Sequence, residues 1–143
     1  MSNEFRVRRG QPSDLAAINE IQQMAPEAAQ WKVMDYLPYQ FYIAEVTLPK
    51  IEATGFIAWR EVTTGEWELL NMAVMPSFRR HGVGSQLLAE LLQLQPASVF
   101  LEVRESNHGA RAFYTLHGFL PMGLRRNYYS SPIENAIVLR FQK

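Results

Sequence analysis

The chain has 143 residues, of which 48% are hydrophobic and 20% charged, and its 14 Lys and Arg balance its 14 Asp and Glu. This length fits one domain spanning residues 1–143, and the composition is that of a globular protein rather than a disordered or fibrous one. The balanced charge argues against a nucleic-acid-binding module, which needs a basic excess. Because the chain contains no cysteine, disulfides, thiolate metal ligands and a cysteine nucleophile are excluded.

The sequence contains no membrane or secretion signal that we recognise. No apolar run approaches the ~20 residues needed to span a bilayer, and the arginines near the N-terminus are not followed by the apolar stretch of a signal peptide. The three histidines are dispersed without a ligand spacing. We therefore expect a cytoplasmic protein with no membrane partner and no metal.

The first half of the chain predicts strands interrupted by short helices. The alternation in Phe5–Arg8 predicts a strand. Leu15, Ile18, Ile21 and Gln22 follow at helical spacing, and the stretch Glu27–Asp35 between two prolines predicts a second short helix. Further strands are expected, from aromatic and β-branched content and one hairpin turn, over Phe41–Val46, Ile51–Val62 and Trp67–Val74.

The second half predicts two amphipathic helices that alternate with strands. The helices are expected over Ser85–Leu94 and Asn107–His117, and the strands over Val99–Val103, Phe119–Tyr129 and Ala136–Phe141. The connection from the strand Trp67–Val74 through a helix to Val99–Val103 predicts a parallel pair. The fold class is therefore α/β, with one mixed sheet and helices packed on it.

The segment Arg79–Ser85 lies between a predicted strand and a predicted helix and is typical of an anion-binding loop. The first turn of a helix presents unpaired amides, while Gly82 and Gly84 allow close approach of a phosphate. Walker A and Rossmann patterns are excluded because the residues that follow Gly84 do not fit either. The alternative is that the two glycines only shape a tight turn.

The motifs in this loop and after it resemble the GNAT superfamily of N-acetyltransferases. The loop Arg79–Gly84 is similar to the family's Q/R-x-x-G-x-G/A acetyl-CoA loop, and Leu101–Asn107 and Phe113–Phe119 resemble the family's second half. The stretch Arg125–Tyr129 is similar to the RimI-type subgroup, which acetylates protein N-termini, notably that of a ribosomal protein. The resemblance implies a mostly antiparallel sheet with a central parallel pair and helices on both faces.

The resemblance also implies which residues bind acetyl-CoA as co-substrate. The backbone of Met72, Ala73 and Val74 would pair with the pantetheine arm, and Asn107, also a favourable N-cap, would contact it. The pyrophosphate would be held by the loop residues Arg79, Arg80, His81, Gly82, Val83, Gly84 and Ser85.

Transfer of an acetyl group to an amine requires a base and an acid, and two glutamates compete for the role of base. Glu102 lies in an apolar strand, where desolvation makes a carboxylate a better proton acceptor, and it matches the glutamate assigned as proton acceptor in RimI-type enzymes. Its alternative is a structural ion pair with Arg104 or Arg125. Glu68, at the start of the preceding strand, is the alternative base. Tyr114 is the expected acid for the departing thiolate, and it also lies near coenzyme A in the family; its alternative is core packing.

Aromatic residues are the candidates for the acceptor groove. Trp31, Tyr36 and Tyr128 combine a large apolar area with a polar tip, although Trp31 and Tyr36 could equally be core residues. We therefore predict an acetyl-CoA-dependent N-acetyltransferase, a monomer or homodimer, in which a primary amine, expected to be a protein N-terminal α-amino group, attacks acetyl-CoA directly in a ternary complex. The alternatives are a small-molecule amine acetyltransferase and a non-catalytic acyl-CoA-binding module.

Overall fold

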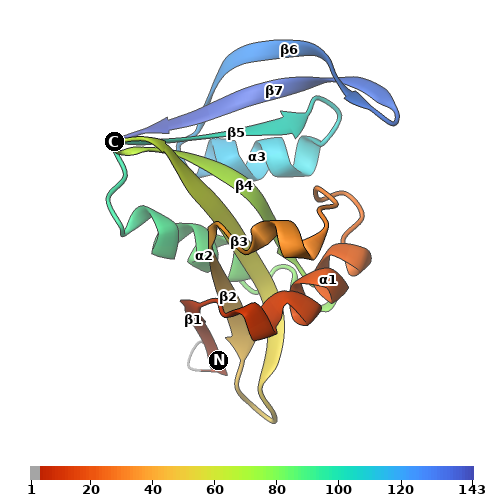
Figure 1. The fold of residues 1–143 in the computed structure, drawn as a ribbon, viewed down its shortest axis with the longest axis vertical. Helices are drawn as coiled ribbons and strands as arrows, with labels where there is room; N and C mark the ends of the chain where they lie inside the picture. The colour runs from red at the N-terminus through yellow and green to blue at the C-terminus, as the bar shows by residue number, and fades with distance from the viewer. Residues whose placement is uncertain (1–3) are drawn as a thin grey trace. The chain divides into compact units, whose positions relative to one another are not determined.

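The computed structural model of the chain describes residues 4–143 and contains strands, α-helices and short 3₁₀ helices in alternation (Figure 1). The helices are α1 (Leu15–Met24), α2 (Val83–Leu92) and α3 (His108–Leu116), with the 3₁₀ helices η2 (Pro12–Asp14), η3 (Val33–Tyr36) and η4 (Pro76–Phe78). The strands are β1 (Phe5–Arg9), β2 (Gln40–Val46), β3 (Glu52–Thr63), β4 (Glu66–Val74), β5 (Ser98–Arg104), β6 (Leu120–Ser130) and β7 (Ile133–Gln142).

The strands form one mixed sheet in the order β1-β2-β3-β4-β5-β7-β6. β4 and β5 pair in parallel, with Glu66 opposite Ser98, and the pairs β1–β2, β2–β3, β5–β7 and β6–β7 are antiparallel. The α/β class and the parallel pair predicted from the sequence are thus confirmed. The chain divides into two compact units, a first unit of residues 4–60 and Leu69–Gln95 and a second unit of Glu61–Glu68 and Pro96–Lys143.

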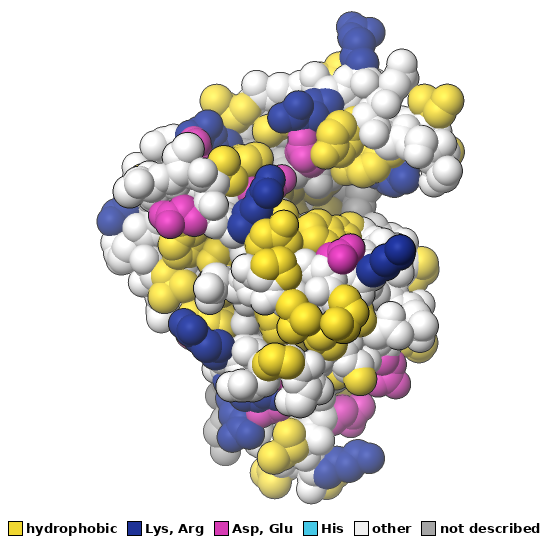
Figure 2. Space-filling model, viewed as in Figure 1, with side chains coloured by type: hydrophobic (Ala, Val, Ile, Leu, Met, Phe, Trp, Pro, Cys, Tyr) yellow, Lys and Arg dark blue, Asp and Glu magenta, His cyan; other side chains and the backbone are white. Residues whose placement is uncertain are grey.

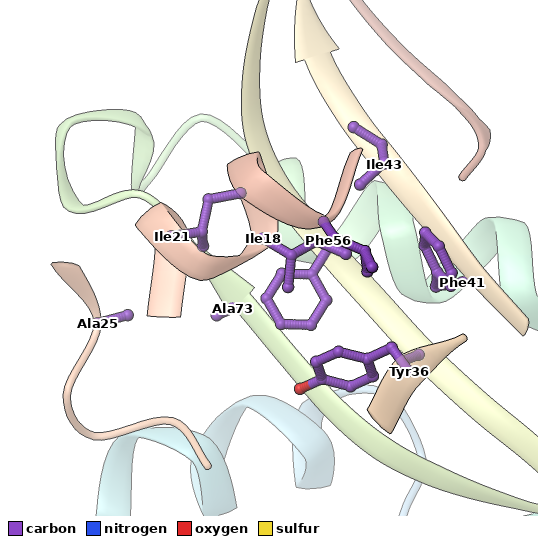
Figure 3. Close-up of a cluster of buried hydrophobic side chains, with 10 residues drawn as sticks. Ile18, Ile21, Ala25, Tyr36, Phe41, Ile43, Phe56 and Ala73 are labelled. Atoms are coloured by element: carbon purple, nitrogen blue, oxygen red, sulfur yellow. The ribbon is translucent and has the colours of Figure 1, made fainter. Parts of the chain in front are cut away.

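The core of the first unit lies between α1 and the adjoining strands. Ile18 and Ile21 lie three residues apart on α1, as the helical spacing predicts, and both are almost fully buried. They pack with side chains from three strands and from η3 (Figure 3). This cluster consists of Leu15, Ile18, Ile21, Ala25, Tyr36, Phe41, Ile43, Phe56, Ala58 and Ala73.

α2 covers the opposite face of β3 from α1. Successive residues of a strand point to opposite faces, and Phe56 belongs to the cluster under α1. A Cβ built on the preceding residue, Gly55, would lie 3.3 Å from side-chain atoms of Val83 and Leu87 on α2 and 2.9 Å from the carbonyl oxygen of Ala73. Glycine at position 55 therefore permits the close approach of α2 and β4 to this strand.

A partly buried ion-pair cluster connects β1 to β2 and to the residue that precedes α1. Arg8 donates to both carboxylate oxygens of Asp14, at 2.9 and 2.8 Å, and pairs with Glu45 at 3.2 Å. Arg6 donates to Glu45 at 2.6 Å. The hydrogen bond from Arg8 lowers the pKa of Asp14. Burial opposes ionisation of Glu45, but the two guanidinium groups prevail and lower its pKa.

The helix predicted over Glu27–Asp35 is wrong, because only the 3₁₀ helix η3 forms near its end. Side chains from within the segment and from α1 and β4 bind carbonyl oxygens of the segment and of the residues just before it. Gln30 donates its amide to the carbonyl oxygens of Gln22, Ala25 and Ala28, between 3.0 and 3.2 Å. Gln22 of α1 donates to Trp31, and Asn71 of β4 donates to Ala29. These bonds hold the segment in an irregular path.

The second unit combines β5, β7 and β6 with α3 (Figure 1). As predicted, Asn107 caps α3, its side chain accepting the amide of Ala110 at 3.2 Å, and Gly118 follows the helix at φ 93°. β6 and β7 lose regular register between Arg125 and Tyr129, where Asn127 takes φ 51°. The Asn127 amide donates to the side chain of Asn135 on β7 at 2.9 Å, which anchors this irregularity.

Candidate active site

The predicted phosphate loop lies in the first unit and has the backbone of an anion-binding turn. Arg80 and Gly82 are both in the left-handed region, with φ 67° and 79°, and Gly82 immediately precedes α2. The first amides of α2 have no partner within the helix. A Cβ at Gly82 would meet no atom within 4 Å, so this turn is open to a bulky ligand. The residues present therefore fit a diphosphate at the N-terminus of a helix.

Two loop side chains contact other parts of the first unit. Arg79 forms an ion pair with Glu27, with both side chains about half exposed. His81 is exposed, and its ring centroid lies 6.2 Å from that of Phe5 and 6.4 Å from that of Phe78. Both side chains lie at the surface beside the turn, where a phosphate ligand would reach them.

A buried network of side-chain hydrogen bonds, which was not predicted from the sequence, connects β4 to α1 and η3. Asn71 donates to the hydroxyl oxygen of Tyr36 at 2.9 Å and to Gln22 Oε1 at 3.2 Å, and Tyr36 donates to Gln22 Oε1 at 2.6 Å. Asn71 Oδ1 accepts the amide of Met72 at 3.0 Å. Leu69, Asn71 and Ala73 are every second residue of β4 and share its buried face. A polar residue on a buried face is the signal that could have revealed the network.

The two aromatic candidates of the first unit are stacked but differ in exposure. The rings of Trp31 and Tyr36 lie 5.0 Å apart at an angle of 10°. Trp31 is partly exposed, whereas Tyr36 is 0% exposed and burial raises the pKa of its hydroxyl. Tyr36 therefore supports Trp31 from within the core and does not itself reach a ligand at the surface.

Glu102 lies in the second unit, and both of its carboxylate oxygens have partners on β6. Tyr128 donates its hydroxyl to Oε1 at 3.0 Å, and Arg125 forms an ion pair with Oε2. The Glu102 side chain is 12% exposed and that of Arg125 is 56% exposed. Of the two ion-pair partners predicted for Glu102, Arg125 is thus the one observed, and Arg104 pairs with Glu134 at 3.2 Å.

Tyr128 lies near both candidate bases. Burial, together with the hydrogen bond to Glu102 and the negative charges of Glu102 and Glu68, raises the pKa of Tyr128, although Arg125 opposes the shift. Glu68 pairs in register with Phe100, two residues before Glu102 on β5. Two carboxylates and a protonated phenol therefore lie near one another in the second unit, on β4, β5 and β6, with β7 between the last two strands.

Asn107 and Tyr114 both belong to the α3 region of the second unit. Tyr114 is 5% exposed, and its ring packs against Phe113 and Phe119 at centroid distances of 5.1 and 5.3 Å. Burial raises the pKa of Tyr114, so this phenol keeps its proton at neutral pH. The core-packing alternative is therefore observed for the ring of Tyr114.

The surface carries charges of both signs. Figure 2 shows Lys and Arg side chains interspersed with Asp and Glu on the face in view. Within residues 4–143, no three His, Asp or Glu side chains gather as a metal site. Across the same residues, no helix is both long and apolar enough to cross a membrane.

Comparison with known proteins gives close matches in sequence and in fold. The model of the acetyltransferase (GNAT) family matches residues 14–119. The [ribosomal protein bS18]-alanine N-acetyltransferase of Salmonella typhimurium is 35% identical over 135 residues, which cover 89% of this chain and 90% of that protein. Several other curated relatives are matched over only about half of their own length, and one from Mycobacterium leprae over 21%.

Two solved structures resemble the chain over nearly its whole length. Ard1 from Thermoplasma volcanium superposes with a TM-score of 0.86 at 29% identity, covering 97% of both chains. The ribosomal-protein-S18-alanine N-acetyltransferase from Escherichia coli superposes with a TM-score of 0.81 at 28% identity, covering 96% of this chain and 93% of that one. The fold and the loop thus define an acyltransferase that uses acetyl-CoA.

The chain belongs to the acetyltransferase (GNAT) family and is an acetyl-CoA-dependent N-acetyltransferase.

Proposed function

We propose that this enzyme acetylates the α-amino group of a protein N-terminus, and that a ribosomal protein is the first acceptor to test. The observation that carries the proposal is the pairing of Glu102 with Tyr128, which sets a carboxylate and a phenol side by side. The match over 90% of a relative named for a ribosomal-protein acceptor supports it. Residues 1–143 would act as a single domain, in the cytoplasm, as a monomer or homodimer.

In this proposal the first unit binds most of the donor. Acetyl-CoA supplies the thioester. The open turn from Arg79 to Ser85 holds its pyrophosphate through helix amides and guanidinium groups. The backbone of Met72, Ala73 and Val74 binds the pantetheine arm. Asn107 is kept as a proposed pantetheine contact on the ground of the family resemblance alone. No metal takes part.

Glu102 is the proposed proton acceptor, and Glu68 is the alternative. The α-amino group of a peptide ordinarily has a pKa of about 7.7–8.0, so most of it is a protonated, unreactive ammonium at neutral pH. Glu102 takes one proton from the ammonium, and the neutral amine attacks the thioester carbonyl carbon. A carbon–nitrogen bond forms, the carbon–sulfur bond breaks, and Tyr114 supplies a proton to the leaving thiolate. The attacking nitrogen loses its second proton as the amide forms, and this proton restores the phenol of Tyr114, so that Glu102 carries the one proton released by the reaction.

Trp31 and Tyr128 are the proposed acceptor-binding residues, each considered within its own unit. Trp31 is partly exposed on its stack with Tyr36, so Tyr36 fixes the ring from behind. Tyr128 is exposed while its hydroxyl is bound to Glu102. Aromatic side chains of this kind suit the recognition of a peptide backbone and its apolar side chains.

The proposal is tested with initial rates of thiol release from acetyl-CoA against short peptides that begin with alanine, with spermidine and lysine as controls. Glu102→Gln retains an oxygen for Tyr128 but removes the base, so kcat for peptides falls about 10²-fold. Glu68→Gln serves as the matched variant on the neighbouring strand and retains most of kcat. If Glu102→Gln keeps wild-type kcat at every pH, the assignment of the base is wrong. If only the small amines react, the acceptor is wrong.

A further inference from the structure

Both oxygens of the Glu102 carboxylate are engaged in the protein without a bound acceptor. Oε1 accepts the hydroxyl of Tyr128, and Oε2 carries the guanidinium of Arg125. Each carboxylate oxygen keeps a second lone pair, but a cationic ammonium that approaches Oε2 meets the positive charge of the guanidinium already paired there. Arg125 and the acceptor therefore compete for this oxygen.

The two partners differ in how readily they can leave. Burial and the neighbouring carboxylates keep the Tyr128 hydroxyl protonated and hence a donor to Oε1. Arg125 is 56% exposed, so a guanidinium that leaves Oε2 returns to water with little change in its solvation. In the ion-paired state its carbon Cζ lies 5.9 Å from the Tyr128 ring centroid.

The backbone of β6 is built to bring both side chains to one carboxylate. In a regular strand, residues three apart point to opposite faces of the sheet. Here the register breaks between Arg125 and Tyr129, Asn127 is left-handed, and its amide is fixed by Asn135. This irregularity turns Tyr128 to the same side as Arg125, which a plain strand would not do.

Another cation can take the place of the Arg125 guanidinium at Oε2 of Glu102. We propose that Arg125 is an exchangeable counter-ion, a specificity-determining residue that holds Glu102 Oε2 until the cationic ammonium of the acceptor takes its place. The inference rests on the proposed function, because the ammonium is that of the N-terminal amine. An ammonium presents the same positive charge and N–H donors as the guanidinium, whereas a neutral acceptor would leave the ion pair intact. Arg125 thereby favours acceptors that arrive as cations.

Other charged and titratable groups lie near the Glu102 carboxylate and contribute, with Arg125, to its electrostatic environment. Tyr129 is the neighbour of Tyr128, with ring centroids 5.1 Å apart, and Arg104 lies over the Tyr129 ring at 4.2 Å. The set facing Glu102 and Tyr128 comprises Arg125, Tyr129, Glu68, Arg104 and Glu134. Of these, Arg125 is the partner in direct contact with Oε2.

The test compares Arg125→Gln with Arg126→Gln, which makes the same charge change at the next, exposed residue of β6. Without the guanidinium, Glu102 Oε2 is open to the ammonium of an alanine-initiated peptide. Because the ammonium no longer competes with Arg125, KM for the peptide falls roughly two- to fivefold.

Controls separate this inference from the proposed function. Arg125→Lys keeps the charge and retains the wild-type KM, while Arg125→Met repeats the neutral change with an aliphatic side chain, and far-ultraviolet circular dichroism verifies the fold of each variant. An unchanged or raised KM in Arg125→Gln, or an equal fall in Arg126→Gln, overturns the proposal. A wild-type enzyme that acetylates none of the peptides refutes instead the proposed function.

Discussion

The buried amide network of the first unit predicts a large loss of stability when Gln22 is truncated. Gln22 is 2% exposed, donates to the carbonyl oxygen of Trp31 at 2.9 Å and accepts the Tyr36 hydroxyl at 2.6 Å. Gln22→Ala leaves that carbonyl and that hydroxyl hydrogen without these partners inside the core. Each buried group left without its hydrogen bond costs about 1–3 kcal/mol, so we expect a loss of about 3 kcal/mol.

Equilibrium unfolding in urea, followed by circular dichroism, measures this loss. Gln23→Ala is the matched control, because Gln23 is the next residue of α1 and is exposed; its free energy of unfolding should change by no more than about 0.5 kcal/mol. For a chain of this length, the expected loss for Gln22→Ala corresponds to a fall in Tm of about 10 °C.

A double-mutant cycle locates the effect in the network. Asn71 donates to both Gln22 and Tyr36, so the losses in Gln22→Ala and Asn71→Ala should not add, the double variant being more stable than the sum of the two by about 1 kcal/mol. A loss below about 1 kcal/mol in Gln22→Ala, or one equal to that of Gln23→Ala, would refute the reasoning that these hydrogen bonds organise the core.

Two further predictions concern acid stability and glycine packing. The pKa values of Asp14 and Glu45 are lowered in the folded state. Their contribution to the free energy of unfolding is therefore present above their ordinary pKa values, and it is lost as the pH falls through their pKa values in the folded protein. The stability gap between wild type and Arg8→Leu, measured by urea unfolding, should thus shrink from about pH 5 to about pH 2; a constant gap would contradict this linkage. Gly55→Ala places a Cβ 2.9 Å from a backbone carbonyl oxygen of β4 and should destabilise the fold by more than about 1 kcal/mol. Gly109→Ala, in α3 with nothing within 4 Å of the new Cβ, should stabilise it by about 0.5–1 kcal/mol, and a gain in both variants would show that β3 and β4 can separate at no cost.

Sequence periodicity predicted the regular elements well because their determinants are local. The α3 region illustrates this, since Asn107 as N-cap and Gly118 as the residue that ends the helix are both readable from residue type alone. The irregular segment after α1 was not predictable in the same way. Its path is set by side chains such as Gln30 and Asn71, the second of which lies more than 40 residues away, and no local pattern encodes them.

In the candidate site, too, some features follow from the local sequence and others depend on residues far away in the chain. Alternation along β5 placed Phe100 and Glu102 on one face, and the burial pattern of the strand agrees with it. The partners of Glu102 depend on the break in β6, and Tyr128 and Tyr129 indeed turn to different partners. A left-handed Asn127 cannot be deduced from the neighbouring residues, because asparagine tolerates that conformation without requiring it.

The irregular turn of β6 makes the spacing of its residues matter more than their identity. Substituting Arg126, an exposed residue, leaves the chain the same length, so Arg125 and Tyr128 still converge. Adding or removing one residue between them would shift the strand by one position and send one of the two side chains through to the other side of the sheet. Among homologous chains, we therefore expect insertions and deletions to be tolerated at the β6–β7 hairpin tip and to be absent from this three-residue interval.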